Sequence, residues 1–84
     1  MTVTPTIGGL LGERVRELRK KRGLTQVEFS ELCGVPQSRI SAIENGSRVP
    51  NVETVLRLAR ALDCKVTALM SVFDEATLSS LLSK

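Results

Sequence analysis

Histidine, tyrosine and tryptophan are absent from this chain of 84 residues, and Phe29 and Phe73 are its only aromatic residues. So few aromatic side chains argue against modules that read RNA or single strands by stacking bases on aromatic platforms. Without histidine, and with the two cysteines far apart in the sequence, a zinc site is not expected. No nucleophile–base pair and no phosphate-binding loop is recognisable, so we expect neither an enzyme nor a bound cofactor.

Long apolar runs and a leader peptide are also missing. No apolar stretch approaches the ~20 residues that span a bilayer, and residues 1–9 lack the basic start and apolar stretch of a signal peptide. Cys33 and Cys64 each lie in an apolar helical pattern. The sequence leaves a disulfide between them open, and we expect two buried, reduced thiols. These absences together favour a cytoplasmic protein with no membrane partner.

Charge is present, but its distribution says more than its sum. The net charge of +3 is a weak basic bias that fits nucleic acid, an acidic partner or neither. Six of the basic residues are concentrated between positions 14 and 22, and Arg39 and Arg48 stand on either side of Asn45 and Gly46. For residues 19–22 the sequence leaves two interpretations open, a solvated helix end or phosphate contacts by one or two side chains.

Apolar spacing and cap residues predict one small domain of five or six short helices. A Thr-, Gly- and Pro-rich arm (1–9) precedes helices at about 10–22, 26–33 and 36–45, a helix that begins at 52, and a last helix at 75–83. Residues 66–71 are a short helix or, less favoured, a strand. In the fourth helix the residues expected to be buried are Val52, Val55, Leu58, Ala59 and Leu62.

The second and third helices form the pair that points to a function. A tight turn through Gly34 joins them, which is the skeleton of a DNA-reading helix-turn-helix. Because a helix turns ~100° per residue, Ile40 and Ile43 define the buried side of the third helix. The opposite side carries Ser38, Ser41, Ala42 and Asn45. Such a small and nearly uncharged face fits the floor of a DNA major groove.

The ordered motifs of this region resemble the Cro and phage-repressor (Xre-type) helix-turn-helix family. The resemblance runs from about residue 16 to about residue 70. Any two of its motifs would be a weak signal of the family, but the full set in this order is a specific one. It rests on Leu24-Thr25-Gln26, Gly34, Ile40-Ser41, Glu44-Asn45-Gly46, Arg48, Pro50 and Leu58-Ala59-x-Ala61-Leu62. It implies an all-α, lambda-repressor-like domain that binds double-stranded operator DNA as a transcriptional regulator, with a homodimeric repressor of an inverted repeat as the expected form.

The resemblance also implies roles for single residues. The DNA-backbone contacts of the family fall on Gln26, Ser41, Asn45 and Arg48. Its base-reading positions fall on Gln37, Ser38 and Ala42, and we add Arg39. A structural ion pair falls on Arg19 and Glu44. From the residues alone, other interpretations stay open: Gln26 as a solvated helix residue, Asn45 as a turn former, and Arg39 as a stem that covers apolar surface.

Two positions depart from the family pattern. Pro36 stands where the family often has a capping Ser or Thr, so that hydroxyl is missing. Ala42 occupies a reading position that often holds a longer polar side chain, and it offers at most a contact to a thymine methyl group. Base reading therefore depends on Gln37 and Arg39, with DNA shape supplying the rest.

The C-terminal segment (72–84) and the outer side of the second helix carry further apolar residues. We expect the domain proper to span 10–71 and the segment after it to form a dimer seam, because a two-fold operator needs a dimer. The seam residues are Val72, Phe73, Leu78, Leu81 and Leu82. The alternative is that they pack back on the domain. With Val27 and Leu32 expected on the surface, the rival function is an antitoxin-type autoregulator whose main partner is a toxin protein.

Overall fold

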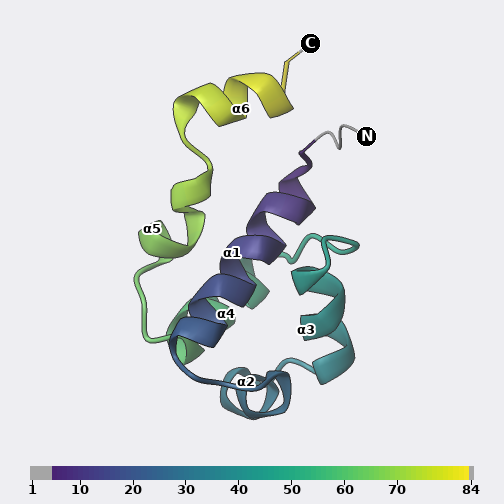
Figure 1. Ribbon diagram of the computed structural model, residues 1–84, viewed down its shortest axis with the longest axis vertical. Helices are drawn as coiled ribbons and strands as arrows, with labels where there is room; N and C mark the ends of the chain where they lie inside the picture. Colours follow the sequence, from purple (N-terminus) through teal and green to yellow (C-terminus); the bar gives the residue numbers. More distant parts are fainter. Residues whose placement is uncertain (1–4, 84) are drawn as a thin grey trace.

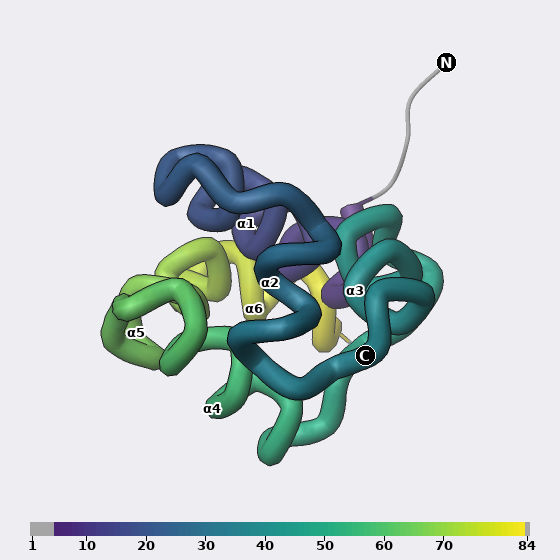
Figure 2. The backbone as a smooth tube through the Cα atoms, turned by 90° about the horizontal axis from the view of Figure 1, so that it is seen from below, coloured from purple at the N-terminus to yellow at the C-terminus, as the bar shows by residue number. Residues whose placement is uncertain are grey.

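The computed structural model describes residues 5–83, which form six α-helices and one 3₁₀-helix with no strand (Figure 1). The all-α prediction is confirmed. The elements are α1 (Ile7–Lys21), α2 (Gln26–Cys33), α3 (Gln37–Glu44), α4 (Val52–Ala61), α5 (Val66–Leu69), η1 (Met70–Val72) and α6 (Glu75–Leu81). Seen from the α2 end, α1, α3, α4 and α5 surround the long axis, and α2 closes the near end (Figure 2).

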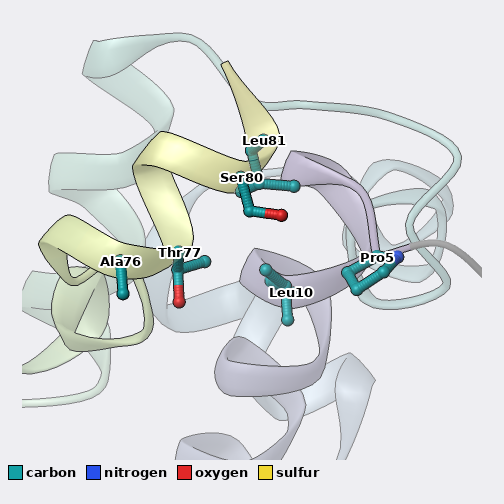
Figure 3. A pocket seen from close by; sticks show the side chains of 6 residues that line it. All are labelled: Pro5, Leu10, Ala76, Thr77, Ser80 and Leu81. Atoms are coloured by element: carbon teal, nitrogen blue, oxygen red, sulfur yellow. The ribbon is translucent and has the colours of Figure 1, made fainter. Parts of the chain in front are cut away.

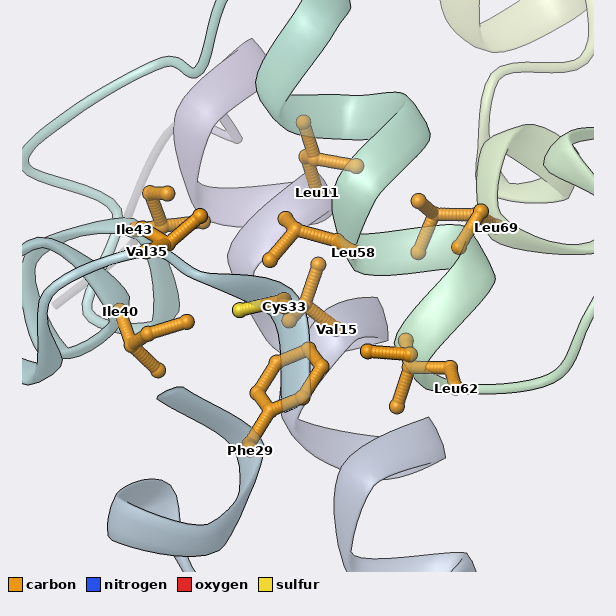
Figure 4. Packing of buried hydrophobic residues seen from close by; sticks show 12 residues of the cluster. Leu11, Val15, Phe29, Cys33, Val35, Ile40, Ile43, Leu58, Leu62 and Leu69 are labelled. Carbon is orange, nitrogen blue, oxygen red and sulfur yellow. The ribbon is translucent and has the colours of Figure 1, made fainter. Parts of the chain in front are cut away.

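A mostly aliphatic core with Phe29 as its aromatic member joins the first five helices. Phe29 of α2, Val15 of α1 and Leu58 of α4 are fully buried and converge with side chains from α3 and α5 (Figure 4). Burying a side chain of this size contributes about 1.5–3 kcal/mol. The buried hydrophobic residues are Leu11, Val15, Phe29, Cys33, Val35, Ile40, Ile43, Leu58, Ala59, Ala61, Leu62 and Leu69. The core thus fixes α2 and α3 against α1 and α4.

Helix α1 begins three residues before its predicted start. The Thr6 side chain accepts a hydrogen bond from the Gly9 backbone N–H at 2.9 Å and so caps a helix that begins at Ile7. Residues 7–9 therefore belong to α1 and not to the preceding arm. The sequence predicts otherwise because glycine disfavours helix interiors. Residues 1–4 of the expected arm lie outside the described residues.

Local end signals explain most of the remaining helix boundaries. Thr25 and Glu28 form the predicted capping box, and the side chains of Asn51 and Asp74 cap α4 and α6. Helix α3 begins at Gln37, one residue later than predicted, because Pro36 is the N-cap and makes no side-chain capping bond. Residues 66–72 are helical, so the strand alternative is wrong, and α6 ends at residue 81.

One burial prediction is wrong, and two are met only in part. Val52 was expected in the core but is 75% exposed, because it lies in the first turn of α4 where it lines an open apolar groove. Val55 is only half-buried. Cys33 is buried as expected whereas Cys64 is half-buried, and both are free thiols. Desolvation raises the pKa of each thiol above its usual value.

Helix α6 stands apart from the core at the far end of the molecule, and none of its described residues is buried (Figure 1). A hollow of about 420 Å³ lies between α6 and the start of α1, with Leu10 and Pro5 on one side and Leu81 on the other (Figure 3). Leu78 is 38% and Leu82 61% exposed. The other expected seam residues, Val72, Phe73 and Leu81, are half-buried, and Phe73 packs against the core.

Over residues 5–83, no group of three Cys, Asp or Glu side chains comes together as a metal site requires. None of the helices described is both long and apolar enough to cross a bilayer.

Candidate nucleic-acid interface

The turn between α2 and α3 sets the angle at which α3 leaves the body. Gly34 adopts a left-handed conformation with φ 72° and ψ 20°, and its N–H donates to the carbonyl of Ser30. The Ser30 hydroxyl donates to the carbonyl of Val35 at 2.6 Å, which closes the turn from the inside. Ile40 and Ile43 are fully buried, so the inner face of α3 packs into the core.

The outer face of α3 is uncharged along its middle and carries positive charge at its edges. Ser38, Ser41 and Asn45 are exposed and Ala42 is half-exposed. Gln37 and Arg39 are also exposed, at the first turn of the helix. Within residues 5–83, the side chains of Gln37, Ser38, Arg39 and Ser41 make no hydrogen bond or ion pair, so their polar atoms remain open to a ligand.

The C-terminal end of α3 is a rigid turn. The Ala42 carbonyl accepts hydrogen bonds from the backbone N–H groups of Ser47 and Arg48 at 3.0 and 3.2 Å. The Ser47 hydroxyl donates to the same carbonyl. The Asn45 side-chain oxygen accepts from the Ser47 N–H at 2.9 Å, so Asn45 does form the turn. Asn45 and Arg48 are both exposed.

An ion-paired clasp of Arg19, Glu44 and Gln26 ties α1, α2 and α3 together. The Arg19 Nε and Nη2 atoms donate to the two carboxylate oxygens of Glu44 at 2.7 and 3.0 Å, and Nη1 donates to the Leu24 carbonyl. Gln26 Nε2 donates to the same carboxylate at 3.2 Å. The hydrogen bond to Glu44 raises the pKa of Arg19. Because both charged side chains are at least nine-tenths buried, the clasp is internal and fixes the end of α3.

Close packing of α1 on the end of α3 is a feature that the sequence did not reveal. A Cβ atom at Gly12 would overlap the carbonyl oxygen of Ile43 and lie 2.9 Å from that of Glu44. At Gly8 it would lie 2.7 Å from the carbonyl oxygen of Gly46. The available signal was the spacing of two glycines four residues apart, which places them on one face of a helix. Assigning Gly8 to the arm hid it.

The basic residues between positions 14 and 22 divide into those that bond to other groups of the chain and those that are only exposed. Arg19 belongs to the clasp, and Arg22 Nη1 donates to the Ala61 carbonyl at 2.6 Å, so neither is a freely solvated helix end. Arg14 pairs with Glu17 and donates to the Ala68 carbonyl. Arg16, Lys20 and Lys21 are exposed, and Arg22 is exposed as well, although its Nη1 bonds to the Ala61 carbonyl.

A second apolar surface, also missed from the sequence, lies where α4 and α5 meet the start of α1. It is a groove of about 280 Å³ with almost no polar lining, and Val52 and Leu56 on its α4 side are 75% and 49% exposed. Its remaining lining residues are Ile7, Leu11, Val49, Pro50, Val55, Val66, Met70 and Phe73. The overestimated burial of Val52 concealed this groove.

Comparison with known proteins decides the family. Residues 15–69 match the family model described as Helix-turn-helix. The chain belongs to this helix-turn-helix family. It is 38% identical over 66 residues to an uncharacterised HTH-type transcriptional regulator, y4dJ, of Sinorhizobium fredii, which covers 79% of this chain and 86% of the relative. It is 40% identical over 55 residues to repressor protein C2 of Salmonella phage P22, covering 66% of this chain and 26% of C2.

Solved structures of helix-turn-helix proteins share its fold. The restriction-modification controller protein C.AhdI of Aeromonas hydrophila aligns with a TM-score of 0.72 at 35% identity, covering 74% of this chain and 94% of that one. The P22 c2 repressor in complex with a synthetic operator aligns with a TM-score of 0.66 at 35% identity, covering 79% and 94%. The fold is therefore lambda-repressor-like. The chain spans most of y4dJ but only about a quarter of full-length C2.

Proposed function

We propose that this chain binds double-stranded DNA in a sequence-specific manner and regulates transcription, acting as a homodimeric repressor on an inverted-repeat operator. Helix α3 of each protomer enters the major groove, and the two half-sites lie one helical turn, about 34 Å, apart. The protein works in the cytoplasm on nucleoid DNA. The chain from the start of α1 to residue 71 forms the reading unit, and the segment from 72 onward serves pairing.

The outer face of α3 is the observation that carries this proposal. An ordinary solvated helix face is dense in Lys and Glu, whereas this one presents Ser38, Ser41 and Asn45, with Arg39 in the first turn of α3 and Arg48 beyond its end. Small uncharged side chains let a helix approach base edges closely, and Arg48 beyond the end of the helix meets a phosphate. The clasp and the glycine contacts hold this face rigid before DNA arrives. Similarity to a repressor solved with an operator supports the same conclusion.

Base reading is assigned to Gln37, Ser38, Arg39 and Ala42. A glutamine pairs bidentately with adenine and an arginine with guanine, whereas Ala42 offers only a methyl contact. Gln26, Ser41, Asn45 and Arg48 are assigned to the DNA backbone. Because Gln26 also donates to Glu44, its phosphate contact would be oriented by the clasp.

The first prediction concerns the two long reading side chains. We expect the Gln37→Ala, Arg39→Ala double variant to lose about 1–3 kcal/mol of binding free energy for each base pair that it no longer reads. The loss should be confined to the positions that these side chains contact, because the variant leaves the rest of the interface intact. The measurement is the dissociation constant on a selected operator and on single-base variants of it, by fluorescence anisotropy.

Arg48→Ala is the matched control for this prediction. It removes a phosphate contact, so binding should weaken by a similar factor on every DNA sequence. Both variants alter exposed side chains, so their melting temperatures should match that of the parent chain. Retention of full operator affinity and full selectivity by the double variant would refute the assignment of the reading residues.

A dimer is the second part of the proposal, and a second copy of this chain is its partner. A two-fold operator requires two reading helices related by symmetry. Leu78 on α6 and Leu82, its C-cap, are exposed, and the apolar groove beside α4 is uncovered in the single chain. Apolar surface of this kind marks an interaction site. We assign these two surfaces to the dimer interface, together with the half-buried Val72, Phe73 and Leu81.

The second prediction tests that interface by solution mass. The parent chain should have the mass of a dimer at micromolar concentration. Leu78→Asp with Leu82→Asp, and separately Leu56→Asp in the groove, should each give the mass of a monomer, because a buried unpaired carboxylate is costly. Leu32→Asp is the control: Leu32 is 59% exposed on α2, away from both surfaces, and should leave the dimer intact. A monomeric parent chain, or charged variants that all remain dimeric, would contradict the assignment.

The alternative, an antitoxin-type autoregulator, keeps the DNA interface and adds a toxin protein as main partner. The observation in its favour is the exposure of Val27 and Leu32 on the outer side of α2, at 49% and 59%. Purification from the native host separates the two proposals. Co-purification of a second small protein, lost in a Val27→Asp, Leu32→Asp variant, favours the antitoxin; a clean homodimer favours the repressor.

A further inference from the structure

Two apolar surfaces of this chain are open at the same time, one of them concave and the other convex. The concave surface is the groove of about 280 Å³ between α4, α5 and the start of α1, which has almost no polar lining. The convex surface belongs to α6, where Leu78 is 38% exposed and Leu82, at the C-cap, is 61% exposed. A helix side of this kind is what an apolar groove accommodates.

Helix α6 has two distinct sides, and only one of them faces its own chain. The residues of α6 that line the hollow beside the start of α1 are Ala76, Thr77, Ser80 and Leu81 (Figure 3). Because a helix turns ~100° per residue, Glu75, Leu78 and Leu82 share the opposite side. All three are exposed. The apolar residues of that side are therefore available to a partner while α6 keeps its place over α1.

The charges beside the two surfaces are complementary. On α4 the exposed Arg60 lies one turn beyond Leu56, and the exposed Lys65 is the N-cap of α5. Neither forms an ion pair within residues 5–83, whereas the other two charged residues of α4 pair with each other. Asp63 lies in the turn between α4 and α5, so positive charge stays in excess at this edge of the groove. The open side of α6 carries the acidic Glu75 instead, and no Lys or Arg occurs between positions 66 and 83. Opposite charges of this kind favour the approach of α6 to the groove.

Self-association of like surfaces fits these features less well. Stable interfaces bury about 1,200 Å² or more in total, and packing α6 on its own copy would contribute only Leu78 and Leu82 from each chain and leave both grooves open. Packing groove on groove would bring together two concave surfaces with edges of the same charge. In a two-fold dimer every contact occurs twice, so docking α6 in the groove covers both helices and both grooves at once.

We propose that two copies of this chain exchange their last helices, so that α6 of each protomer docks by Leu78 and Leu82 in the apolar groove of its partner. The inference rests on the proposed function, because it specifies how the homodimer that binds the operator is built. The occupant of the groove is thus a second copy of this chain, and the acidic Glu75 lies toward the basic edge of the partner's groove.

Complementation between two variants that do not pair tests the exchange. The Leu78→Asp, Leu82→Asp variant keeps its groove, and the Leu56→Asp variant keeps its α6. Neither variant alone forms an intact contact between helix and groove, but an equimolar mixture forms a heterodimer with one such contact. Sedimentation equilibrium should give this heterodimer an association constant at least about tenfold above that of either variant alone and below that of the parent chain.

The matched control is a mixture of Leu56→Asp with Val52→Asp, in which both grooves are altered. It should gain nothing on mixing. If α6 pairs with α6 and groove with groove, the complementation mixture should instead associate more weakly than the single variants, because every contact then includes an aspartate. That result, a gain no larger than in the control mixture, or a monomeric parent chain would overturn the inference. Circular dichroism checks that each variant is folded, and alanine at the same positions provides the comparison if an aspartate variant is not.

Operator binding, measured in parallel, separates this inference from the proposed function. If the parent chain binds a selected duplex but mixing gives no gain, the exchange is wrong and the proposed function stands. If the parent chain binds no duplex, the proposed function fails, and the gain on mixing still decides whether α6 docks in the groove.

Discussion

Glu44→Ala should lower the free energy of unfolding by about 3–5 kcal/mol, because it strands a buried guanidinium. The Arg19 and Glu44 side chains are only 9% and 4% exposed, and the pair is bidentate at 2.7 and 3.0 Å. A domain of this length has a total stability of about 4–13 kcal/mol, so the loss would be a large part of it. The measurement is chemical denaturation followed by circular dichroism.

An exposed ion pair in the same chain serves as the control. Glu53 and Arg57 pair at 3.1 Å on the outside of α4, where their side chains are 74% and 53% exposed. Glu53→Ala should cost at most about 0.5 kcal/mol. The Arg19→Met, Glu44→Met double variant should lose less unfolding free energy than the two single variants lose together. The reason is that the double variant leaves no buried charge without a partner. Equal costs for Glu44→Ala and Glu53→Ala would show that the clasp is not a structural element.

Gly12→Ala should destabilise the fold by about 3 kcal/mol or more, the reverse of its effect in an isolated helix. Alanine is favoured over glycine in a helix interior by about 1 kcal/mol. At this position, however, the new methyl group would overlap the Ile43 carbonyl oxygen and crowd that of Glu44. Both obstacles are backbone atoms, so no side-chain rotation relieves them and α1 must move away from α3. Thermal and urea denaturation measure the loss.

Gly9→Ala is the control on the same helix. A Cβ at Gly9 would contact only the Thr6 hydroxyl, at 3.0 Å, so its cost or gain should stay within about 1 kcal/mol. Because α1 supports the end of α3, Gly12→Ala should also weaken DNA binding at temperatures where the variant is still folded. A Gly12→Ala chain as stable as the parent would mean that α1 does not press on the end of α3 as described.

Local signals explain why the reading unit was predictable from sequence. The Thr25–Glu28 capping box spans four residues, and Gly34 and Pro36 mark the turn between the two helices. These features are decided by neighbours in the chain, so α2 was predicted to the residue and α3 to within one residue at either end. The buried side of α3 followed from the spacing of Ile40 and Ile43.

Contacts between segments far apart in the sequence could not be predicted from local signals. Periodicity shows which side of α4 is apolar but not whether another helix covers it, so the exposure of Val52 was missed together with the groove. The approach of Gly12 to α3 depends on a contact between residues about thirty positions apart. The Arg19–Glu44 pair had no local signal either and was expected only through the family resemblance. The dimer seam stays a prediction, in which Leu78 and Leu82 are open and Phe73 is engaged with the core.

The central claim is that α3 reads the major groove. The most direct test is to select binding sites from random duplex DNA with the purified chain and to record its solution mass at the same concentration. We expect a two-fold symmetric site whose half-site centres lie about 34 Å apart, together with the mass of a dimer. Enrichment should disappear in the Gln37→Ala, Arg39→Ala variant. A library that shows no enriched sequence, or the same enriched sequence with the parent and this variant, would contradict the account.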